Sequence, residues 1–114
     1  MADNTLQLEW RDGSGGQRVL ICTGPLTIAT LFGLRDAAKL AQSQPLILDL
    51  SQVPYIDSAA LGTLVQINVS CQHHGGRLAL AGPTSKTTAL LQMTNLNRIF
   101  KVYPSVAEAE QAPA

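Results

Sequence analysis

The chain has 114 residues, of which 46% are hydrophobic and 4% aromatic, and its eight basic and eight acidic residues cancel. This length and composition are typical of one soluble domain with an ordinary core. No segment gathers Lys or Arg on one face, which argues against a nucleic acid partner. No apolar stretch reaches about 20 residues and residues 1–9 lack leader features, so we expect a cytoplasmic protein without direct membrane insertion.

The two cysteines are expected to be small apolar core residues and not to form a disulfide. Cys22 and Cys71 are far apart and form no CxxC pattern. A chain with this hydrophobic content does not need a disulfide, so we predict that both are reduced. The few aromatic residues leave little for stacking on bases or sugars, which disfavours a ligand platform.

The first elements predict a β-hairpin. Leu6, Leu8 and Trp10 alternate with polar residues, as in a half-buried strand, and residues 18–22 fit its antiparallel partner. The connection at 12–16 is rich in glycine. A phosphate-binding loop lies between a strand and a helix and usually carries a Lys, whereas this connection leads into another strand. We therefore interpret it as a turn.

Helices and strands then alternate. A surface helix is predicted from Ile28 to about residues 43–44, where Pro45 ends it. Residues 46–50 predict a central strand covered on both faces. A second helix begins at residues 57–58 and stops at the glycines at 75–76. The predicted inward residues are Leu31, Leu34, Ala38 and Ala41 in the first helix and Leu61, Leu64, Val65 and Val69 in the second.

The last third continues this alternation. We predict a strand at 78–81, a third helix from 84 to about 95 with Leu90, Leu91 and Leu96 inward, and a strand at 99–103. The capping box of Ser105 and Glu108 predicts a short last helix. The fold class is thus α/β in one domain: a mixed, mainly parallel sheet with an N-terminal hairpin and about four helices. The core should span about residues 6–109, with 110–114 frayed.

The pair Asp57-Ser58 at the start of the second helix is the main candidate site. A helix N-terminus has unpaired N–H groups and positive dipole character, so it would stabilise a phosphoryl group on Ser58. Either Asp57 or Ser58 can be the helix cap. Capping alone does not explain a polar pair followed by the small residues Ala59, Ala60 and Gly62. Ser58 is therefore either a cap or a switch.

Other chemistries at this helix are disfavoured. Ser58 lacks the G-x-S-x-G context of a hydrolase, and His73 and His74 lie about 20 Å away along the helix. Adjacent histidines point in different directions, and Cys71 adds no second ligand cluster. The helix dipole explains the histidines more simply. We predict no catalytic residue, no metal site and no cofactor.

Two further charged residues fit more than one role. Asp49, like Asp57, lies near the expected carboxyl end of a strand, where open α/β sheets place their sites, but it also fits a solvent-facing strand margin. Lys86 could steady an anion near the third helix, although a solvated lysine is the simpler interpretation.

From about Leu6 to Ala109, the chain resembles the STAS domain family of bacterial anti-sigma factor antagonists. The segment at 53–62, which contains D-S-A-A-L-G, is the most specific part of this resemblance. The family usually has D-S-S-G-L-G there, and its first serine is phosphorylated. The other segments are residues 24–27 with Thr30, Leu34 and Arg35, residues 46–50 and residues 75–80.

The resemblance implies a non-enzymatic partner switch on a STAS-like fold. The unmodified protein would bind an anti-sigma factor that is also a serine kinase and so release sigma, whereas phosphorylation of Ser58 would break the complex. A phosphoserine phosphatase would reset it. A phosphoserine carries about −1.5 to −2 charges, which an interface tolerates poorly. By analogy, the partner contacts would be Thr27, Pro54, Tyr55, Ile56, Asp57, Ser58, Ala59, Ala60, Leu61 and Gly62.

The chain departs from the family pattern in two places. Ala59 and Ala60 replace Ser and Gly, which should stiffen the helix start. Pro25 and Thr27 replace two acids of a G-E-L-D segment near the kinase-recognition surface, which favours a different kinase or no phosphorylation. The alternative is a STAS scaffold subunit of a signalling complex or of a membrane transporter assembly. An unrelated enzyme or small-ligand binder is the weakest class, because no catalytic constellation is present.

Overall fold

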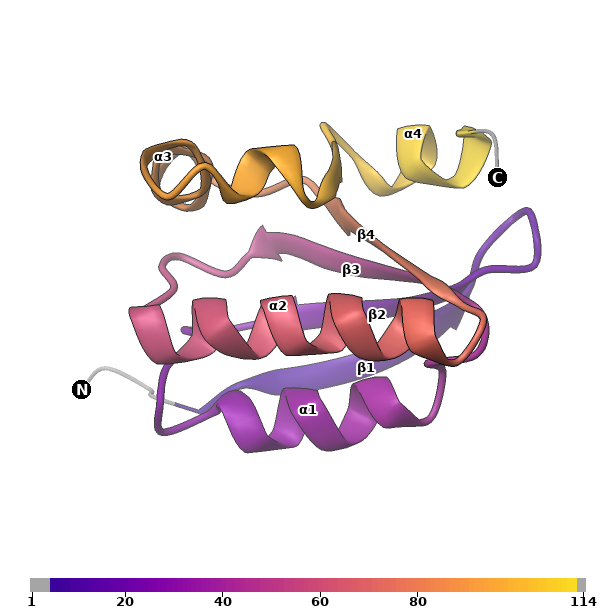
Figure 1. Cartoon of the computed structure of the whole chain (residues 1–114), viewed down its shortest axis with the longest axis horizontal. Coiled ribbons are helices and arrows are strands. Elements are labelled where there is room, and N and C mark those ends of the chain that lie inside the picture. Colours follow the sequence, from indigo (N-terminus) through magenta and orange to yellow (C-terminus); the bar gives the residue numbers. More distant parts are fainter. Residues whose placement is uncertain (1–4, 113–114) are drawn as a thin grey trace.

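The computed structural model describes residues 5–112 as a five-stranded sheet with helices on both faces (Figure 1). The sheet order is β1-β2-β3-β4-β5, in which only the β1–β2 pair is antiparallel. This confirms the predicted α/β class and the edge hairpin. The elements are β1 (Gln7–Asp12), β2 (Arg18–Thr23), α1 (Leu31–Lys39), β3 (Pro45–Gln52), α2 (Ser58–His73), β4 (Arg77–Ala81), α3 (Ser85–Met93), the 3₁₀ turn η1 (Leu96–Arg98), β5 (Lys101–Tyr103) and α4 (Val106–Gln111).

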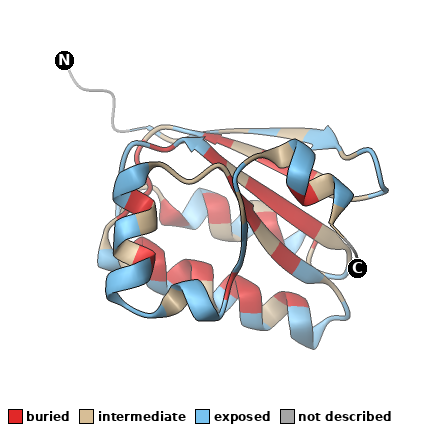
Figure 2. Ribbon diagram, turned by 90° about the horizontal axis from the view of Figure 1, so that it is seen from above, coloured by how far each residue is buried: buried red, intermediate tan, exposed pale blue. Residues whose placement is uncertain are grey.

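The alternation of side chains along the strands divides the core into two parts. Leu20, Leu48 and Leu80 point to the face covered by α1, α2 and α3, where most buried residues gather. Ile47 and Ala81 point to the opposite face, which α4 covers. The buried cluster on that face is much smaller. Figure 2 shows buried residues along the central strands and the inward sides of the helices. The first face therefore supplies most of the hydrophobic stabilisation.

Helix α1 is shorter than predicted. It begins at Leu31 and ends at Lys39, so Ile28 is not helical and is 59% exposed. The apolar spacing includes Ile28, but Thr30 bonds back to the backbone at Thr27 and Pro25, and this turn delays the helix. The prediction that Ile28 begins the helix is therefore wrong.

Three predictions along the rest of the chain also need correction. Val69 is 58% exposed, because α2 buries its Leu64 and Ile67 side instead. The third helix ends at Met93, and Asn95 adopts a left-handed conformation, with φ of 60°, that begins η1. The last strand starts at Lys101, so the predicted strand residue Ile99 lies outside it and is 51% exposed.

The predicted short last helix is present. The hydroxyl of Ser105 accepts a hydrogen bond from the N–H of Glu108, as expected of a cap. Glu110 and Gln111, which were predicted to fray, belong to α4, and the Glu110 carboxylate accepts from the N–H of Ser14 in the β1–β2 turn. The predicted frayed residues 113 and 114 lie outside the described residues.

Both cysteines are free and buried, as predicted. Burial, together with the nearby Asp49 carboxylate, raises the pKa of the Cys22 thiol to about 12. Burial also raises the pKa of Cys71. Each thiol therefore stays protonated at neutral pH and packs as a small apolar group.

Candidate functional site

Two loops lie side by side at the carboxyl ends of β2 and β3. The N–H of Leu26 donates to the carbonyl of Tyr55 at 3.1 Å, and the N–H of Asp57 donates to the carbonyl of Leu26 at 3.1 Å. This pairing is a short parallel bridge between Leu26 and Ile56. It joins the segment before α1 to the segment before α2, and both apolar side chains are buried. The two loops therefore form one surface.

The carboxylate of Asp57 holds this surface together. Its Oδ1 accepts from the N–H of Ala60 at 2.9 Å, which makes Asp57 the N-cap of α2. Its Oδ2 accepts from the N–H of Ile28 in the neighbouring loop, also at 2.9 Å. Of the two candidate caps, the structure thus selects Asp57. Both oxygens are used, so one side chain fixes the helix start and the adjacent loop.

The loop at 24–30 is shaped by two threonines. The Thr30 hydroxyl donates to the carbonyl of Pro25 and accepts from the N–H of Thr27, each at 2.9 Å. The Thr27 hydroxyl accepts from the N–H of Ala29. Gly24 precedes this turn with φ of +115°, and a side chain there would collide with the backbone of Thr5. Local side-chain hydrogen bonds therefore fix the conformation of this loop, which is one of the two loops of the site.

Ser58 is the first residue of α2 and is exposed. Its hydroxyl makes no hydrogen bond within the described residues, since Asp57 already provides the cap. The hydroxyl thus stands at the helix N-terminus, where N–H groups and the positive end of the dipole favour an anion. The site can accept a negative group without losing its cap.

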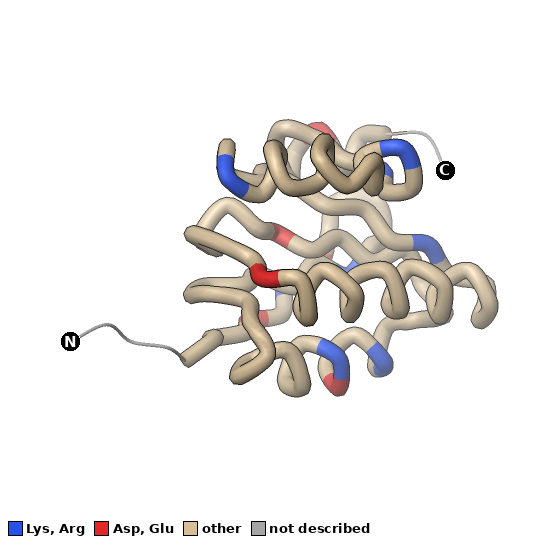
Figure 3. Tube along the Cα trace, turned by 60° about the vertical axis from the view of Figure 1, so that its left-hand side comes forward, with Lys and Arg blue, Asp and Glu red and all other residues tan. Residues whose placement is uncertain are grey.

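The surface around Ser58 carries almost no charge. Helix α2 contains no Lys, Arg, Asp or Glu, and Figure 3 shows it tan along its length. Residues 24–32 and 53–63 contain no Lys or Arg, and Asp57 is their single acid. Any partner of this surface meets chiefly apolar groups and backbone.

The predicted contact residues divide by accessibility. Pro54, Tyr55, Ser58 and Gly62 are exposed, and Tyr55 is 45% exposed. Thr27, Asp57 and Ala59 are half-buried, whereas Ile56, Ala60 and Leu61 are buried in the core and support the surface from beneath.

Two exposed apolar residues beside this surface were not among the predicted contact residues. Ile28 is bonded through its N–H to Asp57, and Phe32 is 51% exposed in the first turn of α1. The polar residues at 27 and 30 that flank Ile28 were the available signal, because threonines at this spacing favour a turn.

The other candidate residues do not join Ser58. Asp49 lies on the α4 face of the sheet, where its Oδ1 accepts from the N–H and hydroxyl of Ser51. Lys86 is exposed on α3. His74 caps the opposite end of α2 and its Nδ1 lies 2.8 Å from the carbonyl of Ser70. Among residues 5–112, no three His, Cys, Asp or Glu side chains gather in the manner of a metal site.

Comparison with known proteins identifies the family. The sequence model of the STAS domain matches residues 11–109, which is most of the chain. The chain belongs to the STAS domain family. Across the part of the STAS domain that the structure describes, no helix is both long and apolar enough to span a membrane.

Individual relatives agree with this assignment. A Thermotoga maritima protein named as an anti-sigma factor antagonist is 44% identical over 64 residues, which are 56% of this chain and 57% of that protein. The crystal structure of an anti-sigma factor antagonist from Mycobacterium paratuberculosis superposes with a TM-score of 0.82 at 21% identity, covering 96% of this chain and 95% of that one. The phosphorylated form of the Bacillus cell fate determinant SpoIIAA gives a TM-score of 0.64 at 15% identity, covering 84% and 90%. The last two likenesses establish the fold.

Proposed function

We propose that this STAS domain is an anti-sigma factor antagonist whose binding is switched off by phosphorylation of Ser58. The main support for the proposal is that two adjacent residues have different roles. Asp57 caps α2, so the exposed Ser58 hydroxyl is not needed as a cap. A serine that the fold does not use for capping is available to a kinase. The names of the relatives support the same role.

The helix start supports a phosphoryl group on Ser58 within this domain. The first N–H groups of an α-helix have no partner inside the helix, and their dipoles point toward an anion. The carboxylate of Asp57 opposes a second negative group nearby, but it stays tied to the N–H groups of Ala60 and Ile28. The domain keeps its fold after modification, so phosphorylation acts on the partner complex.

The partner surface proposed here consists of the exposed residues around Ser58. Pro54, Tyr55 and Gly62 come from the α2 side, and Ile28 comes from the facing loop. An interface over these uncharged groups excludes water. A phosphate carrying about −1.5 to −2 charges must then be desolvated without a cation from this chain, which weakens the complex. The partner is an anti-sigma factor with serine kinase activity, and a phosphoserine phosphatase restores binding.

The test compares two serines in matched positions. Ser58 is the first residue of α2 after the cap Asp57, and Ser85 is the first residue of α3 after the cap Thr84. Isothermal titration calorimetry measures the affinity of each variant for the anti-sigma factor. Ser58→Ala should bind with the same affinity as the wild type. Ser58→Asp should bind at least about tenfold more weakly, whereas Ser85→Asp should not change the affinity.

Circular dichroism of each variant controls for folding. Unchanged binding of a folded Ser58→Asp variant would rule out the switch. An equal loss in Ser85→Asp would show a general charge effect and would contradict the assigned surface.

A scaffold role is the second candidate, and it is favoured by Pro25 and Thr27, which stand where two recognition acids are usual. In that case the STAS domain joins a signalling complex or a transporter assembly and is never phosphorylated. Protein purified from its native cells under several growth conditions would then always have its unmodified mass.

A further inference from the structure

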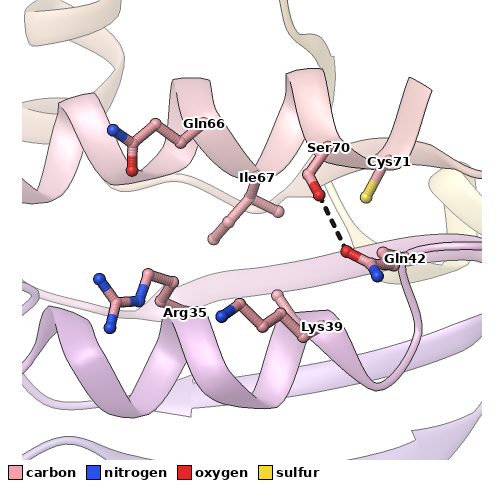
Figure 4. Close-up of a pocket in the computed structure, with 8 residues that line it drawn as sticks. Arg35, Lys39, Gln42, Gln66, Ile67, Ser70 and Cys71 are labelled. Carbon is pink, nitrogen blue, oxygen red and sulfur yellow. Dashed lines mark hydrogen bonds between the residues drawn. The ribbon is translucent and has the colours of Figure 1, made fainter. Parts of the chain in front are cut away.

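A cavity of about 150 Å³ lies between α1 and α2, away from the Ser58 surface. It is lined by residues 35–42 of the α1 region and residues 66–71 of α2 (Figure 4). Gln66 is eight residues beyond Ser58, which is about 12 Å along a helix. The cavity is therefore a second feature of the molecule that the proposed switch does not use.

The lining combines two cations with an apolar floor. Arg35 and Lys39 are one turn apart on α1 and both side chains extend along the cavity, with Gln66 above them (Figure 4). The nearly buried side chains of Ala38 and Ile67 form the floor. No acidic residue lines the cavity, so the charged groups of the lining itself are both positive.

Two side chains in the lining have N–H groups without a hydrogen-bond partner in the described fold. The Gln42 amide uses its Oε1 to accept from the Ser70 hydroxyl at 2.8 Å, which leaves its N–H groups available. The Arg35 Nε atom is buried without a hydrogen-bond partner and pairs with the Asp36 carboxylate at 3.8 Å, while the guanidinium carbon lies 4.9 Å from the centre of the Phe32 ring. Neither Asp36 nor Phe32 lines the cavity, so these two neighbours hold Arg35 at its edge. Burial raises the pKa of the Cys71 thiol, so this group stays neutral.

Helix dipoles alone do not explain these cations. The cavity lies toward the C-terminal ends of α1 and α2, where a basic residue is favourable, and Lys39 is in the last turn of α1. However, the terminal carbonyls already accept from turn N–H groups, such as those of Leu40, Ala41 and Gly76. The two helix ends together amount to about one negative elementary charge, and two cations, one of them paired with Asp36, line this cavity.

The size of the cavity limits the ligand. A cavity of about 150 Å³ holds a molecule of roughly the size of benzene, and larger metabolites need about 300 Å³ or more. Two cations one turn apart match two carboxylates better than one, and a guanidinium pairs with a carboxylate through two hydrogen bonds. The apolar floor suits a short carbon chain.

We propose that the cavity between α1 and α2 binds a small dicarboxylate of the size of succinate, with Arg35 and Lys39 holding the carboxylates and Gln42 and Gln66 donating to them. This site is independent of the proposed phosphorylation. Its occupant bridges the two helices on the main core face of the sheet.

An NMR titration of the purified ¹⁵N-labelled protein with succinate tests this proposal. Amide signals of residues 35–42 and 66–71 should shift and saturate. Arg35→Gln and Lys39→Gln should each raise the dissociation constant at least about tenfold, because each removes a charge-assisted hydrogen bond. Matched controls at exposed cations elsewhere, Arg98→Gln and Lys86→Gln, should leave it unchanged.

Three outcomes would overturn the dicarboxylate site: no saturable shift, equal affinity for inorganic phosphate, or equal affinity for the neutral succinamide. Ser58→Asp should bind succinate like the wild type. Since the titration needs no protein partner, its failure would leave the switch proposal standing, and failure of the switch would not affect the titration.

Discussion

The two ends of α2 differ in what their neighbours supply. At the amino end, a facing loop offers backbone groups and the apolar Ile28, and Asp57 is the single acid. In the carboxyl-terminal half, α1 offers Arg35 and Lys39 around a cavity. The helix itself has no charged residue. The chemistry of each end therefore comes from the element packed beside it, and this difference underlies the proposed protein surface at one end and the proposed small-anion site at the other.

Both ends of α2 rest on the same hydrophobic core. Removing a buried side chain from this core gives the largest predicted change in the free energy of unfolding. Leu64 is fully buried midway along the helix. Leu64→Ala should lower the free energy of unfolding by about 2 to 5 kcal/mol, since it removes buried methyl groups and leaves a cavity. Urea denaturation measures this change. Val69→Ala, on the exposed side of the same helix, should stay within about 0.5 kcal/mol; equal losses would contradict the assigned buried face.

The buried Cys22 of β2 should make the free energy of unfolding depend on pH. The Cys22 thiol has its pKa raised from 9.0 to about 12, first by burial and then by Asp49. Between these pH values the unfolded chain loses the proton and the folded chain keeps it, so stability is full below 9 and falls as pH rises, by up to about 1.4 kcal/mol per pH unit.

Denaturation of the wild type and Cys22→Ala at about pH 8 and pH 10.5 separates this effect from the titration of lysines and tyrosines. The wild type should lose about 2 kcal/mol more than the variant over this interval. Parallel losses in the two proteins would show that Cys22 is not buried as a neutral thiol.

The two hydrogen bonds that Asp57 accepts at the start of α2 should contribute less to the free energy of unfolding. Asp57→Ala removes the acceptors of the Ala60 and Ile28 N–H groups and should cost about 1 to 2 kcal/mol. Ser58→Ala should change the free energy of unfolding by less than about 0.5 kcal/mol, because its hydroxyl has no partner in the described fold. The reverse order, measured by thermal or urea unfolding, would make Ser58 the cap and leave the switch without its structural basis.

The smallest predicted effect is an increase in stability, from a substitution at Gly62. Gly62 is exposed within α2, and a Cβ atom there would contact nothing within 4 Å. Gly62→Ala should therefore raise stability by about 0.5 to 1 kcal/mol. If this turn of the helix contacts the proposed anti-sigma factor partner, the same variant should bind that partner more weakly while melting at a higher temperature. Unchanged affinity would remove Gly62 from the contact surface.

The sequence predicted the fold because most of its signals are local. Glycine turns, apolar periods and the Ser105 capping box each act within a few residues, and they placed the start of α2 correctly at Asp57-Ser58. The order of the strands did not follow, because it depends on pairing between distant segments.

The parts that the sequence did not predict depend on contacts across the fold. The bond from the Ile28 N–H to Asp57 joins residues 29 positions apart, and apolar spacing alone assigned Ile28 to the start of the first helix. Val69 was assigned inward for the same reason, since a helix that is largely apolar has more than one candidate stripe. The cavity between α1 and α2 also arises only when the two helices pack.

Intact-mass and peptide mass spectrometry of the endogenous protein test whether Ser58 is a phosphoacceptor. We expect a fraction of molecules with one added phosphoryl group, located on Ser58 and absent from a Ser58→Ala strain. A protein that carries no phosphoryl group under any growth condition, or one modified at another residue, would contradict this expectation.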